Sequence, residues 1–102
     1  MLMQDWHSLT DLEMLSEFGA RIRLARIERN LTQQMLADRS GLNRSTIRDL
    51  ENGRSVNLLS LMQLLRSMEL LEKLNLLLPG SSQSPVLAKL QNERKRVKLS
   101  KK

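Results

Sequence analysis

The stretch Leu31–Gly53, LTQQMLADRSGLNRSTIRDLENG, decides the fold. It predicts two short helices that are joined by a tight turn. Thr32 is a good N-cap for the first helix, and Asn43 is a good N-cap for the second. Gly41 can adopt the positive φ that the turn requires, and Gly53 can end the second helix in a left-handed conformation.

The second of these helices, over residues 44–51, has one apolar face and one polar face. Ile47 and Leu50 lie on the apolar face. The polar face consists of Arg44, Ser45, Arg48, Asp49 and Asn52. An α-helix fits into the major groove of DNA, where Arg can donate two hydrogen bonds to guanine and Asp can accept one from cytosine. The pattern therefore predicts a helix that reads DNA bases.

Two alternatives stay open for this polar face. Arg44 can contact only the DNA phosphates, because many protein–DNA hydrogen bonds go to the backbone. Asp49 can instead pair with Arg48 or cap the helix locally.

Apolar spacing predicts further helices on both sides of this stretch. Thr10 and Glu13 form the capping box of a long first helix, which Gly19 is expected to bend or split. A later helix starts at Asn57, and leucines then recur as far as Pro79. The expected core includes Leu15, Phe18, Ile22, Ala25, Met35, Leu36, Ala37, Leu58, Leu61, Met62, Leu65 and Met68.

The composition favours an all-α protein without a metal or a cofactor. The 102 residues fit one small domain with tails, and aromatic residues make up only 2%. Cysteine is absent and His7 is the one histidine, so no metal site is predicted. The sequence contains no nucleophile–base arrangement and no phosphate-binding loop, so we expect no enzymatic activity. Without a signal peptide or an apolar stretch of about 20 residues, we expect a cytoplasmic protein with no membrane contact.

The net charge of +6 is unevenly distributed. Up to Pro85, ten basic residues balance ten acidic ones. Residues 86–102 contain seven basic residues and one acid, Glu93. Residues 1–20 contain four acids and no Lys or Arg, whereas residues 21–58 contain eight arginines and four acids. The basic middle suits contact with phosphates, and the tail could attract either phosphates or an acidic partner.

The stretch Leu31–Gly53 resembles the Cro/cI-like (XRE) helix-turn-helix family. The resemblance rests on the LTQ start, Ala37, Gly41 and the ENG end. It implies an all-α, five-helix DNA-binding domain over 18–78, with an N-terminal extension over 1–17 that runs into the first helix. A linker and a disordered basic tail over 79–102 are expected to follow. The implied function is sequence-specific binding of double-stranded operator DNA and regulation of transcription.

The same resemblance implies roles for individual residues. Gln33 would contact a phosphate and support the reading helix, and Asn52 would contact the DNA backbone. Arg26 and Glu51 would form an ion pair that joins two helices, although Glu51 can also be an ordinary surface acid. The residues implied to touch DNA are Gln33, Arg44, Ser45, Thr46, Arg48, Asp49 and Asn52.

The segment from Arg54 to Leu78, with the linker and basic tail after it, resembles HipB-like antitoxins. That likeness implies a homodimeric repressor that binds a palindromic operator, regulates its own operon and associates with the nucleoid. It also implies a HipA-like serine/threonine kinase toxin as a partner. A stand-alone regulator without a toxin is the alternative. The predicted dimer interface consists of Leu71, Leu74 and Leu78, unless this leucine run only completes the core.

Overall fold

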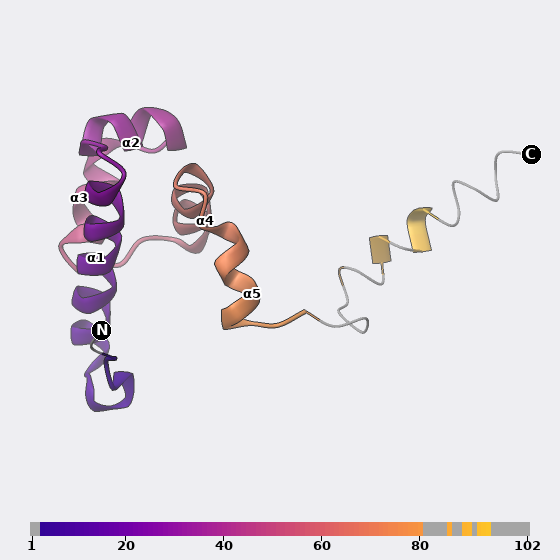
Figure 1. Cartoon of the computed structure of the whole chain (residues 1–102), viewed down its shortest axis with the longest axis horizontal. Helices are drawn as coiled ribbons and strands as arrows, with labels where there is room; N and C mark the ends of the chain where they lie inside the picture. Colours follow the sequence, from indigo (N-terminus) through magenta and orange to yellow (C-terminus); the bar gives the residue numbers. More distant parts are fainter. Residues whose placement is uncertain (1–2, 81–85, 87–88, 91, 95–102) are drawn as a thin grey trace, which may run out of the picture. The chain divides into compact units, whose positions relative to one another are not determined.

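The computed structural model describes residues 3–80, 86, 89–90 and 92–94, and all regular secondary structure in them is helical. The elements are η1 (Trp6–Ser8), α1 (Asp11–Glu28), α2 (Gln33–Ser40), α3 (Arg44–Glu51), α4 (Leu58–Ser67), η2 (Leu71–Lys73) and α5 (Leu74–Leu77) (Figure 1). The prediction of an all-α fold is therefore confirmed. The chain divides into two compact units, Met1–Leu71 and Glu72–Lys102, and the first contains α1 to α4.

Helix α1 begins with the predicted capping box. The backbone N–H of Glu13 donates to Thr10 Oγ1 at 3.2 Å, and the backbone N–H of Thr10 donates to Glu13 Oε1 at 2.9 Å. These bonds satisfy two backbone donors that a helix start would otherwise leave without partners. At the other end of α1, Asn30 has a φ of 57°, and the N–H of Leu31 donates to the carbonyl of Arg26. This turn leads directly into α2.

Helix α1 runs without interruption through Gly19, so the expected bend or split was wrong. Gly19 is buried where α1 and α3 lie side by side (Figure 1). A Cβ atom at this position would overlap the carbonyl oxygen of Leu50 and lie 3.0 Å from that of Glu51. Gly19 is therefore a packing residue: its missing side chain allows the two helix backbones to approach closely.

The core of the first unit lies between four helices. Helix α1 packs on α3, α3 packs on α2, and α2 packs on α4. The buried apolar residues are Ile22, Leu31, Leu36, Ala37, Ile47, Leu50, Leu64 and Met68. Two predicted core residues, Met35 and Leu58, are exposed instead. Met35 is exposed because Leu36 and Ala37 form the inner side of α2, and Leu58 is the first residue of α4.

The turn between α2 and α3 fixes the orientation of α3. Gly41 ends α2 with a φ of 76°, which a residue with a side chain adopts only with strain. Asn43 is the N-cap of α3, but its side chain makes no capping hydrogen bond, so its predicted role was only partly right. Its backbone carbonyl instead accepts from the N–H of Thr46 at 3.0 Å.

Two backbone hydrogen bonds close the C-terminal end of α3. The N–H of Gly53 donates to the carbonyl of Leu50, and the N–H of Arg54 donates to the carbonyl of Asp49. Gly53 has a φ of 81°, as the sequence predicted. This pair of bonds is the Schellman arrangement, and it fixes the path of the chain directly after α3.

The leucine run is not one helix. Helix α4 ends at Ser67, Glu69 has a φ of 59°, and two short elements, η2 and α5, follow. Beyond Gly80 the structure describes residues 86, 89–90 and 92–94, and all of them are helical. The predicted disorder also concerned the other tail residues, which lie outside the described residues. No helix in the described part of the chain is long and apolar enough to cross a membrane.

Candidate nucleic-acid interface

The outer face of α3 carries exposed polar side chains. Arg44, Ser45 and Arg48 are exposed on this helix, and Asn52 is exposed directly after it. On the inner side, Ile47 and Leu50 are buried in the core, whereas Thr46 is half-buried. Burial of the apolar side holds α3 against the domain and leaves its polar side free to enter a DNA groove.

Asp49 does not pair with Arg48. Its Oδ1 atom lies 3.5 Å from a guanidinium nitrogen of Arg54, and its side chain is 37% exposed. Arg54 follows the end of α3, where its backbone N–H donates to the carbonyl of Asp49. Sequence reasoning missed Arg54 because the pairing arises from the turn at the helix end and not from helical spacing.

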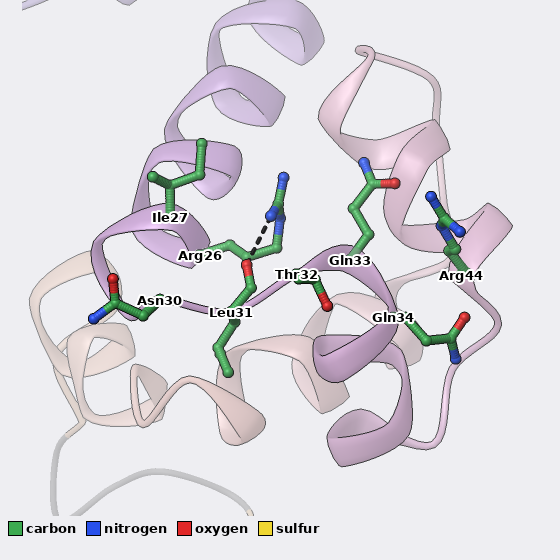
Figure 2. A pocket seen from close by; sticks show the side chains of 8 residues that line it. All are labelled: Arg26, Ile27, Asn30, Leu31, Thr32, Gln33, Gln34 and Arg44. Atoms are coloured by element: carbon green, nitrogen blue, oxygen red, sulfur yellow. Dashed lines mark hydrogen bonds between the residues drawn. The ribbon is translucent and has the colours of Figure 1, made fainter.

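The structure brings Arg26 and Glu51 together in a buried ion pair. Arg26 Nε donates to Glu51 Oε2 at 2.6 Å, and a second guanidinium nitrogen donates to Glu51 Oε1 at 3.0 Å. The third nitrogen donates to the carbonyl of Leu31 at 2.8 Å (Figure 2). These hydrogen bonds to Glu51 raise the pKa of Arg26, although burial acts in the opposite direction. The pair therefore joins α1, α3 and the start of α2.

Gln33, the first residue of α2, also bonds to Glu51. Its Nε2 atom donates to Glu51 Oε1 at 3.1 Å, so the buried carboxylate holds the half-buried carboxamide in place. Thr32 caps the helix by accepting from the N–H of Met35. The N–H groups of Gln33 and Gln34 in the first turn have no partner within the helix.

An open pocket of about 550 Å³ lies at this helix start. Figure 2 shows the residues that line it, which come from the end of α1, the start of α2 and the start of α3. They are Arg26, Ile27, Asn30, Leu31, Thr32, Gln33, Gln34 and Arg44. The free N–H groups of this helix start and the exposed Arg44 beside them favour binding of an anion. The phosphates of DNA are such anions. The pocket is therefore a candidate phosphate site, and it lies beside the exposed polar face of α3.

The leucines of the predicted dimer interface are not gathered on one element. Leu71 begins η2 and is half-buried, Leu74 begins α5 and is half-buried, and Leu78 is 76% exposed. The division between the two compact units falls between Leu71 and the other two leucines. No cluster of metal-ligating side chains occurs in the described part of the chain.

Comparison with protein families identifies the class. The sequence model of the helix-turn-helix family matches residues 22–76, which is more than half of the chain. The chain therefore belongs to the XRE-type helix-turn-helix family, as the resemblance over Leu31–Gly53 predicted. It is a DNA-binding protein of the kind that regulates transcription. A comparison with curated proteins found no match.

Proposed function

We propose that this regulator is a repressor that reads the major groove of its operator with the outer face of α3. The observation that carries the proposal is the exposure of Arg44, Ser45 and Arg48 on a helix whose opposite side is buried. Two exposed arginines one helical turn apart can each donate two hydrogen bonds to a guanine. Asn52, directly after the helix, is within reach of the DNA backbone.

In this proposal the Gln33 pocket sets the position of α3 on the DNA. Gln33 uses one amide hydrogen for Glu51 and retains the other, together with the free N–H groups of the helix start, for a phosphate. Because phosphate contacts fix the register of a protein on the duplex, Gln33 would determine which base pairs α3 meets. Asp49 contributes to base recognition only when it is not paired with Arg54.

Selection from a pool of randomised duplexes tests the proposal directly. The purified chain should enrich one sequence, and it should bind that sequence at least about 1,000-fold more tightly than a scrambled duplex at physiological salt. Equal affinity for both duplexes would contradict sequence-specific reading. The salt dependence of both affinities should be measured, because phosphate contacts alone produce a steep dependence.

We also propose that the repressor acts as a homodimer on a palindromic operator. One helix reads only a few base pairs, and two copies on half-sites about 34 Å apart combine their affinities. Support comes from the second unit, where Leu76, Leu77 and Leu78 are all exposed and offer an apolar surface to another copy. The proposed interface consists of Leu71, Leu74 and Leu78.

The HipB-like features over 54–78 and in the basic tail support a narrower proposal. In it the repressor is the antitoxin of a HipA-like kinase and regulates the operon that encodes both proteins. A kinase gene next to the gene for this chain, together with a stable complex of the two purified proteins, would support the proposal. The stand-alone regulator is favoured if the neighbouring gene product does not bind the chain.

A further inference from the structure

Two small hollows adjoin each other where α2 and α4 end. Their volumes are about 200 Å³ and 160 Å³, and both are bordered by Arg39 and Ser67. Arg66 borders the larger hollow and Arg29 borders the smaller one. Three arginines therefore surround one spot, two from the last turns of α2 and α4 and one directly after α1, and all three are exposed. We refer to Arg29, Arg39 and Arg66 as the arginine patch.

The patch carries positive charge that the domain itself does not neutralise. Glu69 is the one acid among the residues that line the two hollows. Ion pairs between described residues involve Arg21, Arg26 and Arg54, and none involves the patch. Arginines near helix C-termini also offset the helix dipole, but that role needs no convergence of three helices.

The three arginines differ in how they are held. Arg29 is fixed in place, since its Nε donates to the carbonyl of Met68 at 3.1 Å and another nitrogen donates to that of Ala25 at 2.8 Å. The guanidinium groups of Arg39 and Arg66 donate to no other described residue, and neither does the side-chain amide of Gln63 beside them. The patch thus combines one rigid arginine with free donors.

No arginine of the patch belongs to α3 or lines the phosphate pocket, although Leu31 borders both that pocket and the smaller hollow. Helix α2 contacts α3 and also α4; Arg39 lies in the last turn of α2, Arg66 in the last turn of α4, and Arg29 directly after α1. Gln33 lies at the N-terminal end of α2, about 10 Å from the C-terminal end that carries Arg39, along an eight-residue helix. A partner on the patch could therefore bind while α3 occupies DNA.

We propose that the arginine patch is the docking site for an acidic segment of a protein partner. Aspartate or glutamate side chains of that segment would enter the hollows and pair with Arg39 and Arg66, because a guanidinium group matches a carboxylate with two parallel hydrogen bonds. The hollows are smaller than the 300–1,000 Å³ typical of small-molecule sites, roughly the size for single side chains. This inference goes beyond the DNA-reading function and does not depend on it.

Titration of the ¹⁵N-labelled full chain with hexaglutamate peptide tests the proposal. We expect the amide signals of Arg39, Ser40, Gln63 and Ser67 to shift in a saturable way, and to shift more than those of Arg44 and Arg48. In the double variant Arg39→Gln and Arg66→Gln, the dissociation constant obtained from the signals of Ser40, Gln63 and Ser67 should rise at least about fivefold. The matched control Arg23→Gln removes an exposed arginine of α1 outside the patch and should leave this constant unchanged.

Two results would overturn the proposal. One is hexaglutamate shifts that are no larger at the patch than at Arg44 and Arg48, or a dissociation constant that is unchanged in the double variant. The other is a DNA result: if the double variant binds a 20-base-pair duplex with a smaller salt slope than the wild type, the patch contacts phosphates. The thermal melt of each variant should match that of the wild type. A double variant that melts at a lower temperature is replaced by Arg39→Lys with Arg66→Lys. This replacement keeps both charges but removes the forked geometry of the guanidinium groups.

Discussion

Glu51 Oε1 accepts a hydrogen bond from Gln33 Nε2 at 3.1 Å, so a carboxylate buried in α3 holds the first side chain of α2. The same carboxylate takes two hydrogen bonds from Arg26. The ion pair between Arg26 and Glu51 therefore has two consequences: it joins α1 to α3, and it orients a side chain that faces the candidate phosphate site.

Breaking the Arg26–Glu51 pair should strongly destabilise the domain. The side chain of Glu51 is 1% exposed and that of Arg26 is 10% exposed, so removal of either partner leaves a buried charge. We expect Arg26→Met and Glu51→Leu each to lower the free energy of unfolding by about 3–5 kcal/mol. The double variant should lose much less than the sum of the two, as denaturant unfolding can measure. Small, additive losses would mean that the pair contributes little.

Gly19→Ala should destabilise the domain, although Ala favours a helix. In an exposed helix this change stabilises by up to about 1 kcal/mol. Here the added methyl group overlaps the carbonyl of Leu50, so α1 and α3 must separate, at a cost of about 1–3 kcal/mol. The matched control Ala20→Gly, at the exposed neighbouring position, should cost about 1 kcal/mol through propensity alone. A more stable Gly19→Ala protein in thermal melts would refute the close approach.

Gly19 also illustrates which features the sequence could predict. The caps at Thr10 and Thr32 and the left-handed Gly41 and Gly53 follow from local rules, so the helix boundaries could be predicted from the sequence. The close approach at Gly19 depends on where another helix lies, and helix propensity carries no information about that. The same reason accounts for the exposure of Met35, because α3 and α4 together determine which side of α2 is covered.

Helical spacing predicted which side of α3 is exposed, whereas the contacts that form at turns were not predicted. The exposed side of α3 follows from its apolar positions, Ile47 and Leu50. The Asp49–Arg54 pair and the arginine patch depend on how the chain turns after a helix and on which helix ends meet. Neither is encoded in a short repeating pattern.

The capping box should give α1 a defined pH dependence. The hydrogen bond from the backbone N–H of Thr10 to the carboxylate, followed by a smaller effect of the Thr10 hydroxyl, lowers the pKa of Glu13 below its ordinary value. A lowered folded-state pKa stabilises the fold above the unfolded-state pKa, and this contribution is lost as the pH falls through the folded-state value. NMR titration of the Glu13 carboxyl should show the low pKa. Thr10→Ala removes the hydroxyl but keeps the backbone N–H, so it should raise the Glu13 pKa only part of the way toward its ordinary value. A Glu13 pKa at its ordinary value in the wild type would contradict the stabilising role of the capping box.

Arg44→Ala should remove selectivity for the operator and leave the fold intact, because Arg44 is exposed on α3. Loss of a two-bond contact with a base should cost about 1–3 kcal/mol of discrimination. Affinities for the selected duplex and a scrambled duplex are measured side by side. Arg23→Ala, which removes an exposed arginine of α1, serves as the control. Equal weakening on both duplexes would show that Arg44 contacts only phosphate.

Leu78→Glu should convert the proposed dimer to monomers without unfolding the chain. Leu78 is 76% exposed, so a charge there meets water in the single chain but apolar surface in the proposed interface. We expect light scattering to show a monomer mass at micromolar concentration, and operator affinity to fall sharply because the two half-sites no longer act together. Leu59→Glu, a change at another exposed leucine on α4, is the control and should leave the mass of the dimer unchanged. A wild-type chain that scatters as a monomer, or a Leu78→Glu chain that remains a dimer, would rule out this interface.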